Sequence, residues 1–164
     1  MEVFMKKYQF VHSGDYVKIL LHKIPEKPGV AAKILSIIAR ENINILTIKH
    51  TVHSKEKGEF AFTVKAEDAD ETIDLMKKNL KDIGAKDLTV RRDLALVFIW
   101  GDEIKNLGEF ASDVLRAFSQ YNVEFDSLSL AIEGITCIVP NDQFNSAMHA
   151  FNKMFVDEPI ISPI

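Results

Sequence analysis

Two helical stripes of apolar residues, 80 residues apart, constrain the fold of this chain more than any other feature. Each stripe has the spacing i, i+1, i+4, i+5, i+8, which places its members on one face of an α-helix. The first consists of Val30, Ala31, Ile34, Leu35 and Ile38, and the second of Phe110, Ala111, Val114, Leu115 and Phe118. A similar turn and strand start follows each stripe, at 42–45 and at 122–125. The pattern predicts two copies of one structural unit.

Further strands and a second helix surround each of these helices. The expected strands are 16–24, 43–53, 59–66 and 87–92 in the first copy, and 94–100, 123–132 and 135–139 in the second. Asp68, with Glu71 at capping-box spacing, is expected to cap the second helix of the first copy, and Asn141 that of the second copy. The first copy thus has the β-α-β-β-α-β order of a ferredoxin-like sandwich.

The second copy has no candidate for a fourth strand after its second helix. Pro159 and Pro163 lie in the last nine residues, and proline cannot donate a ladder hydrogen bond. The segment 2–11, in which Val3, Met5, Tyr8 and Phe10 are apolar, is free to complete the second sheet. The predicted fold is therefore α+β, with two ferredoxin-like sandwiches, the first inserted within the second. The expected units are 14–92, 93–156 plus 1–13, and a tail at 157–164.

Charge and register both disfavour nucleic-acid binding. The chain carries 24 acidic and 20 basic side chains, a net charge of −4, which repels a phosphate backbone. The run 57–64 is similar to the Lys-Gly-aromatic motif of RNA-recognition domains. However, Glu59 occupies the first aromatic position, and Phe60 and Phe62 are expected on the core side of the sheet.

Composition also bears on location. The longest apolar runs, such as Leu94 to Trp100, are far short of the roughly 20 residues that span a bilayer, so we expect no membrane span. Cys137 is the single cysteine, lies in an apolar run, and cannot form an internal disulfide. No charged, then apolar, then small-residue leader follows Met1. These observations predict a cytoplasmic protein.

Motifs for cofactors, metals and catalysis are absent from the sequence. The seven glycines are scattered, so no loop is built to cradle phosphates. His50 and His53 are three apart on a predicted strand and should point to opposite faces, which disfavours chelation of one metal. No acidic pair is spaced for acid–base catalysis. We therefore expect neither a cofactor nor a metal.

The loop before the first helix is the strongest candidate for a binding site. In the segment Glu26 to Ala31, Pro28 fixes φ, and Gly29 allows close approach of a ligand to the backbone. The unpaired N–H groups of a helix start attract a carboxylate, and Glu26 is suited to an ammonium group. A free amino acid carries both groups. The alternative is a plain Pro-Gly turn that begins a helix.

At these positions the chain resembles the regulatory region of aspartokinases, a tandem pair of ACT domains. The resemblance is carried by 9–11, 17–21, the loop at 26–33, and the segments 42–45, 60–64 and 122–139. The family also completes its second ACT unit with the strand that precedes the first. ACT units bind small effectors, typically amino acids, at interfaces between paired units, and the effectors of aspartokinases are lysine or threonine.

The resemblance implies a set of ligand-binding residues in the first copy. These are Glu26, Lys27, Pro28, Gly29, Val30, Ala31, Asn44, Ile45, His50 and Thr51. The sequence departs from the family at Glu26, where aspartate is usual, and at His50 and Thr51, which stand where a Gln-Asn pair is expected. In the second copy Gly108 and Glu109 replace the Pro-Gly turn. The amino-terminal Lys-Phe-Gly-Gly-Thr signature of the kinase part is missing, so this chain should not phosphorylate aspartate.

The sequence as a whole predicts a noncatalytic, amino-acid-binding regulatory module, with lysine or threonine as effector. We expect a homodimer, because a four-stranded sheet leaves open edges and Phe98 and Trp100 lie on a strand that is apolar on both faces. An aspartokinase catalytic subunit is a further expected partner. Two alternatives remain open: a ligand-free ACT-like scaffold for protein interaction, and a small enzyme on the ferredoxin-like fold.

Overall fold

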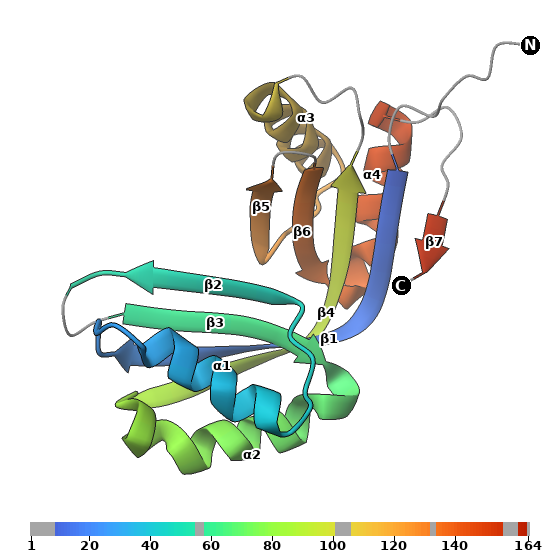
Figure 1. Ribbon diagram of the computed structural model, residues 1–164. Helices are drawn as coiled ribbons and strands as arrows, with labels where there is room; N and C mark the ends of the chain where they lie inside the picture. Colours follow the sequence, from blue (N-terminus) through green and yellow to red (C-terminus); the bar gives the residue numbers. More distant parts are fainter. Residues whose placement is uncertain (1–8, 55–57, 101–105, 132–133, 156–160, 164) are drawn as a thin grey trace, which may run out of the picture. The chain divides into compact units, whose positions relative to one another are not determined.

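The computed structural model describes residues 9–54, 58–100, 106–131, 134–155 and 161–163 (Figure 1). In chain order the elements are β1 (Gln9–Ile24), α1 (Val30–Arg40), β2 (Thr47–Val52), β3 (Gly58–Lys65), α2 (Ala66–Ile83), β4 (Asp87–Trp100), α3 (Leu107–Gln120), β5 (Ser127–Ala131), β6 (Gly134–Pro140), a 3-10 turn η1 (Asn141–Gln143), α4 (Phe144–Phe155) and β7 (Ile161–Pro163). The predicted α+β architecture of ferredoxin-like repeats is confirmed.

The contacts divide the chain into two compact units. One is Asp15–Arg92, called here the continuous unit. The other combines Met1–Gly14 with Asp93–Ile164 and is called the discontinuous unit. Each is described by itself below.

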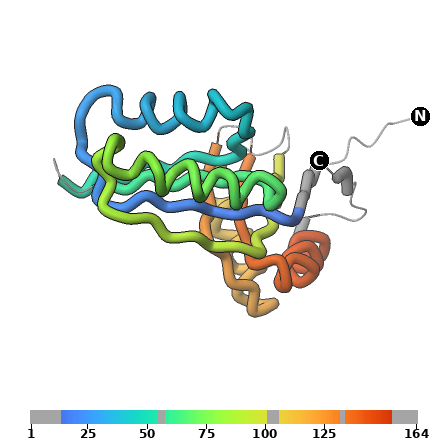
Figure 2. The backbone as a smooth tube through the Cα atoms, turned by 90° about the horizontal axis from the view of Figure 1, so that it is seen from below, coloured from blue at the N-terminus to red at the C-terminus, as the bar shows by residue number. Residues whose placement is uncertain are grey.

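The continuous unit is an antiparallel sheet with both of its helices on one face (Figure 1, Figure 2). β3 pairs with β1 on one side, with Leu21 opposite Phe60, and with β2 on the other, with His50 opposite Phe60. The strand order is β2-β3-β1-β4. Strand and helix residues together bury a core of aliphatic and aromatic side chains, among them Val17, Ile19, Leu21, Ile34, Ile38, Phe60, Phe62, Val64, Ile73 and Met76. Because strand residues alternate, this core occupies the face that the helices cover.

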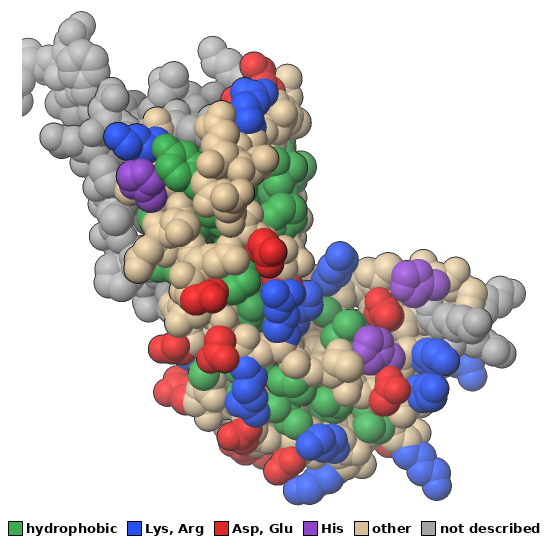
Figure 3. Space-filling view, turned by 180° about the vertical axis from the view of Figure 1, so that it is seen from behind, with side chains coloured by type: hydrophobic (Ala, Val, Ile, Leu, Met, Phe, Trp, Pro, Cys, Tyr) green, Lys and Arg blue, Asp and Glu red, His purple; other side chains and the backbone are tan. Residues whose placement is uncertain are grey.

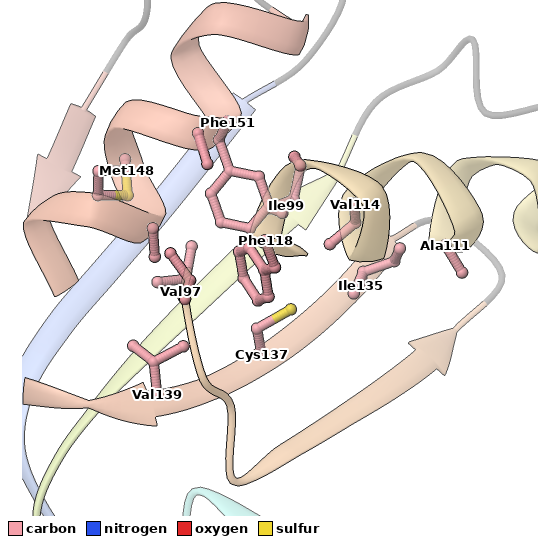
Figure 4. Packing of buried hydrophobic residues seen from close by; sticks show 14 of the residues in the cluster. Val97, Ile99, Ala111, Val114, Phe118, Ile135, Cys137, Val139, Met148 and Phe151 are labelled. Carbon is pink, nitrogen blue, oxygen red and sulfur yellow. The ribbon is translucent and has the colours of Figure 1, made fainter. Parts of the chain in front are cut away.

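The discontinuous unit has a core of its own, between its strands and the helices α3 and α4 (Figure 4). β6 pairs antiparallel with β4 and with β5. Phe118 and Phe151 pack with ring centroids 5.0 Å apart. Cys137 lies on β6 beneath Phe118, fully buried, and burial raises the pKa of its thiol to about 12. A thiol that stays protonated behaves as a small apolar side chain, as the sequence predicted.

Two long strands carry the chain from one unit into the other, and this differs from the prediction. We expected separate strands at 87–92 and 94–100, but β4 runs without interruption through both, and β1 runs from Gln9 to Ile24. Asp15 and Asp93, the residues at which the unit assignment changes, have φ values of 63° and 56°. Aspartate tolerates this left-handed region better than most residues, so each strand continues through its aspartate without ending. Residues 2–8 of the expected first strand lie outside the described residues.

Both predicted helix caps are wrong. α2 begins at Ala66 after Lys65, with no side-chain cap, so Asp68 lies inside its first turn. There Asp68 and Glu67 still favour the helix, because negative charge is stabilised near a helix N-terminus. Asn141 belongs to the 3-10 turn, and α4 begins only at Phe144.

The start of β2 and the carboxy-terminal tail also differ from expectation. β2 begins at Thr47 rather than at 43, and Ile43, which precedes it, is buried in the core. The tail was expected to make a poor strand, yet β7 pairs in parallel with β1, from Phe10 opposite Ile161 to His12 opposite Pro163. Pro163 is the last residue of this short strand, which lies off the main strand order, and proline is tolerated on such edge strands.

Candidate functional site

The loop that joins β1 to α1 is held in shape by its own backbone. The N–H of Lys27 donates to the carbonyl of Pro25 at 3.0 Å, and that of Val30 donates to Lys27 at 3.3 Å. Gly29 precedes the helix with φ 93°, a left-handed conformation that favours glycine, although a Cβ there would meet no atom within 4 Å. Glycine is therefore favoured at this position by the backbone conformation and not by a lack of space for a side chain.

The start of α1 has no side-chain cap. Gly29 is its N-cap, no side chain accepts a hydrogen bond from the first turn, and that turn holds no acidic residue. Lys27, Pro28 and Gly29 are exposed, whereas Val30 and Ala31 are half-buried against the core. The exposed start of a helix with open N–H donors favours an anion such as a carboxylate.

Glu26 points from this loop towards the sheet, and its carboxylate meets His50. The His50 Nε2 and Glu26 Oε1 atoms are 3.1 Å apart, and only 13% of the Glu26 side chain is exposed, against 34% for His50. The imidazole also lies 5.8 Å from the ring of Phe60, measured between centroids. The structure thus brings together the loop and one residue of β2.

Thr51 does not share this location with His50. The two are neighbours on β2, so their side chains point to opposite faces of the sheet. His50 lies opposite Phe60, on the face that the helices cover, whereas Thr51 lies opposite Glu59. The two residues expected to line one pocket are therefore separated by the sheet.

Asn44 and Ile45 lie in the connection between α1 and β2, beyond the far end of the helix. The eleven residues of α1 span about 16 Å at 1.5 Å per residue, and this length separates the connection from the Glu26 loop. Asn44 is exposed, and Ile45 packs against the core. Within one copy of the chain, these two residues do not join the loop.

The corresponding helix of the second copy, α3, is capped at its N-terminus by a side chain. Asn106 caps α3, and its Oδ1 accepts hydrogen bonds from the N–H groups of Gly108 at 3.1 Å and Glu109 at 3.2 Å. These donors are therefore bound by a side chain, whereas the start of α1 has no side-chain cap. The difference agrees with the loss of the Pro-Gly turn from this copy.

A second charged cluster, on the opposite face of the continuous unit, was missed by the sequence analysis. Glu59 on β3 lies between two imidazoles: His22 Nδ1 is 3.3 Å from its Oε1, and His53 Nε2 is 3.5 Å from its Oε2. His22 also meets the Thr89 hydroxyl at 2.9 Å. The hydrogen bond from His22 holds the pKa of Glu59 below its ordinary value, partly opposed by desolvation. Alternation along β3 was the available signal, since it places Glu59 opposite the core face.

The described residues contain no group of three His, Cys, Asp or Glu side chains that is placed to hold a metal ion. Within the same residues, no helix is both long enough and apolar enough to cross a membrane. Phe60 and Phe62 are buried in the core, each 1% exposed, so neither can stack on a nucleic-acid base. Basic and acidic side chains are interspersed on the face shown in Figure 3.

Comparison with known proteins identifies the part of the chain that holds this loop. The family model for the ACT domain matches residues 19–78, which include the loop, α1, β2 and β3. The candidate site at Glu26 and His50 therefore lies entirely within the segment that matches the ACT domain.

Most of the chain is similar to aspartokinases. An aspartokinase of Thermus thermophilus is 27% identical over 143 residues, which cover 86% of this chain and 35% of that protein. The aspartokinase of Pseudomonas aeruginosa is 25% identical over 146 residues, with 88% and 35% covered. The chain thus spans about a third of the length of the curated relatives it matches.

Solved structures match over nearly the whole chain. The ligand-free regulatory subunit of aspartate kinase from Thermus thermophilus superimposes with a TM-score of 0.80 at 25% identity, covering 92% of this chain and 99% of that one. A structure of aspartokinase alpha and beta subunits has the same fold, with a TM-score of 0.80 at 20% identity over 90% and 97% of the two chains. Over nearly its whole length the chain therefore matches the regulatory subunit of an aspartate kinase.

Proposed function

We propose that this chain is an amino-acid-binding regulatory module of the aspartokinase type, with its effector at the Glu26 to Ala31 loop. The observation that carries the proposal is the pairing of two complementary features on one loop. An uncapped helix start suits the carboxylate of an amino acid, and the Glu26 carboxylate suits its ammonium. The helix start of the second copy is capped by Asn106 and lacks the first feature.

The proposed binding mode assigns one role to each part of the loop. The N–H groups of Gly29 and Ala31 hold the effector's carboxylate, because that of Val30 already donates to the carbonyl of Lys27. Glu26 holds the ammonium, and Lys27 and Pro28 shape the turn between them. His50 borders the effector's side chain. Asn44, Ile45 and Thr51 take part only where a second copy of the chain brings them to the loop, because within one copy they lie elsewhere.

We further propose lysine or threonine as effector, a homodimer as the functional form, and the cytoplasm as its location. The relatives support the first choice: a structure of E. coli aspartokinase III, with the same fold at a TM-score of 0.66 and 16% identity, holds lysine and aspartate. The structure that contains aspartokinase alpha and beta subunits supports a separate catalytic subunit as partner.

A ligand-free scaffold is the second candidate, and one observation favours it. His50 already meets the carboxylate that the effector's ammonium would need. In a scaffold, this contact would simply fasten the loop to β2, and the module would act through protein contacts alone.

A thermal-shift screen with the free amino acids tests the proposal against this alternative. A ligand at 100 times its dissociation constant adds roughly 2.7 kcal/mol to the free energy of unfolding. For a domain of this size, each kcal/mol raises Tm by about 2 to 4 °C. We expect a shift with lysine or threonine. No shift with any amino acid at millimolar concentration, followed by no heat in calorimetric titration, would leave the scaffold function.

A further inference from the structure

Three side chains on adjacent strands of the continuous unit form a chain of hydrogen bonds on the face opposite the helices (Figure 1). His22 on β1 lies directly opposite Glu59 on β3, and the strand order β3-β1-β4 places Thr89 on its other side. The His22 Nδ1 and Glu59 Oε1 atoms are 3.3 Å apart, and the His22 Nε2 and Thr89 Oγ1 atoms are 2.9 Å apart. A hydroxyl, an imidazole and a carboxylate are therefore connected in that order.

The carboxylate determines which nitrogen of the imidazole carries the proton. An ionised carboxylate only accepts hydrogen bonds, so His22 Nδ1 is the donor to Glu59. In a neutral imidazole the other nitrogen then has a free lone pair, and Nε2 accepts the hydrogen bond of the Thr89 hydroxyl. The pKa of Glu59 is lowered, chiefly by the hydrogen bond from His22, so the carboxylate stays ionised at neutral pH.

This order of groups is that of a nucleophile, a general base and the residue that orients the base. A hydroxyl is a weak nucleophile until an adjacent base takes its proton, and in the Ser-His-Asp triad Nε2 faces the hydroxyl while Nδ1 faces the carboxylate. His22 presents the same two nitrogens to the same two kinds of group. Its distance of 2.9 Å from the Thr89 hydroxyl is within the reach that proton transfer requires.

The backbone that follows the imidazole is irregular. The register of β1 against β3 shifts between His22 and Ile24, and Lys23 between them has a φ of 52°, in the left-handed region. Bulges of this kind re-aim the side chains beside them and are frequent next to active sites. The carbonyl of His22 accepts a hydrogen bond from the N–H of Lys86 at 2.9 Å, which holds the start of β4 beside the imidazole. The backbone thus supports the contact between His22 and Thr89 from both strands.

The hydroxyl is open to reagents from solvent. Thr89 is exposed, and the side chains of His22 and Glu59 are 24% and 38% exposed. Developing charge is stabilised weakly at a water-exposed site, so the partner in a reaction must itself have a good leaving group. Thioesters and aryl esters are acyl donors of this class.

We propose that Thr89 is a modification site, a nucleophilic hydroxyl that accepts an acyl group from an activated ester, with His22 as general base and Glu59 as its positioning residue. The O–H bond breaks, its proton moves to His22 Nε2, and Oγ1 forms a bond to the acyl carbon. The tetrahedral intermediate then expels a thiolate or phenolate, which takes up the proton from Nε2. The product is a threonine ester. The site lies on the opposite face of the sheet from the Glu26 loop and does not depend on the proposed function.

Two reagents test the inference on the full chain. A fluorophosphonate reacts with activated hydroxyls and leaves a stable phosphonate ester with loss of fluoride, and p-nitrophenyl acetate supplies an acyl group with release of p-nitrophenolate. Mass spectrometry of the digested protein locates each adduct and gives its rate of formation. We expect both adducts on Thr89 in the folded protein and neither in Thr89→Val.

The role of the imidazole is tested by its removal. Labelling of Thr89 should be roughly a hundredfold slower in His22→Gln, since a general base contributes about 10² to 10⁴ to the rate. His149→Gln is the matched control, because it removes an exposed histidine of α4 whose ring contacts Tyr121, and it should label like wild type. Circular dichroism melts confirm that each variant is folded.

The positioning role of the carboxylate has a spectroscopic signature. Nitrogen NMR should show the His22 ring with its proton on Nδ1 in wild type. In Glu59→Gln this preference should be lost, because a neutral amide donates as well as accepts, and labelling of Thr89 should be slower. A carboxylate that acts only on stability would leave both the tautomer and the labelling rate unchanged.

The remaining outcomes overturn the inference without a variant. Absence of an adduct on Thr89 with both reagents shows that the hydroxyl is not activated. Equal labelling of Thr89 in the folded chain and in the chain unfolded in urea leads to the same conclusion, and so does an unchanged rate in His22→Gln. The hydrogen bonds of His22 would then serve only to fasten three strands together.

Discussion

The carboxylate of Glu26 lies directly on the backbone of Gly58, in the space that a β-carbon at position 58 would occupy. Gly58 is the first residue of β3, and its φ is not in the left-handed region. Glycine is therefore needed here for a neighbour's side chain and not for its own conformation. The loop, β2 and β3 meet at this point, so a substitution of Gly58 tests the candidate site without replacing any of its polar side chains.

Gly58→Ala should displace the Glu26 carboxylate while the fold survives. The overlapping atoms are the far end of a flexible side chain, which can swing away, although Ile24 Cγ1 also lies 3.1 Å from the new methyl group. We expect a loss of stability of about 1 kcal/mol, typical of mild overpacking, and effector binding weakened by roughly tenfold, as for a lost charge-assisted hydrogen bond. Thermal melts and calorimetry measure the two effects.

Gly108→Ala is the matched control for that substitution. A Cβ there meets Asn106 Oδ1 at 3.5 Å, an ordinary contact, and Gly108 lies within α3. Alanine should stabilise this helix by roughly 0.5 to 1 kcal/mol without changing binding. Unchanged affinity in Gly58→Ala would remove Glu26 from the site.

Glu26→Gln should weaken effector binding by roughly tenfold or more, because a charge-assisted hydrogen bond to a partly desolvated amine contributes about 1.5 to 3 kcal/mol. The amide keeps the shape of the side chain and can still contact His50, so we expect the fold to persist. Glu109→Gln, at the capped start of α3, provides the comparison and should alter affinity little. Calorimetric titration of both variants with the effector shows whether it binds at Glu26. Equal affinities for wild type and Glu26→Gln would place the binding site elsewhere.

Glu59 should make the continuous unit more sensitive to acid. Its pKa is lowered in the folded state, chiefly by the hydrogen bond from His22. A lowered pKa contributes stability that is present above the unfolded value and is lost as the pH falls through the folded value. The Tm difference between wild type and Glu59→Gln should therefore be present at neutral pH and shrink below the ordinary titration range of glutamate. A difference that does not vary with pH would show that Glu59 acts through packing alone.

The helices and the loop from Glu26 to Ala31 were predictable because their signals are local. The 3.6-residue period of Ile34 and Ile38 predicts a buried face, and both are fully buried. Pro28 and Gly29 mark the start of α1 for the same reason. The long strands were not predictable, since Asp15 and Asp93 are typical turn residues, and only pairing with neighbouring strands keeps the chain extended on both sides of them.

The contacts of the site depend on strand register, which no local pattern specifies. His50 meets Glu26 because β2 pairs with β3 so that His50 lies opposite Phe60. A slip of one residue would have turned Thr51 to that face instead. The Glu59 cluster likewise needs the register of three strands, and for this reason the sequence showed its histidines only as separate strand residues.

Removal of the first twelve residues should destabilise the protein strongly. A chain that starts at Ser13 loses the part of β1 from Gln9 to His12, which pairs with β7. Each lost ladder hydrogen bond contributes about 1 kcal/mol net. Several such bonds, at about 2 to 4 °C per kcal/mol, predict a fall in Tm of roughly 10 °C or insoluble protein.

A chain that starts at Gln9 isolates the contribution of this segment, because it keeps all of β1 as described. Circular dichroism melts of the two truncations and the full chain make the comparison. If the chain that starts at Ser13 melts like the full chain, the amino-terminal segment is dispensable, and it does not complete the sheet of the discontinuous unit.

Self-association should occur through the edge of the sheet at β2. This strand ends the strand order among the described residues, and Ile48 and Val52 on one of its faces are 51% and 63% exposed. An edge strand with exposed apolar side chains is a template for pairing with a second copy, and lysine on such an edge opposes pairing. Ile48→Lys should therefore weaken dimerisation at least tenfold, which corresponds to about 1.4 kcal/mol. Leu115→Lys is the control. It also replaces a partly exposed aliphatic side chain with lysine, but on α3, and should leave the dimer intact.

Equilibrium sedimentation at micromolar concentrations, with and without lysine or threonine, measures the association of both variants. A wild-type chain that stays monomeric at tens of micromolar under all of these conditions contradicts the homodimer, and equal weakening by both substitutions moves the interface away from β2.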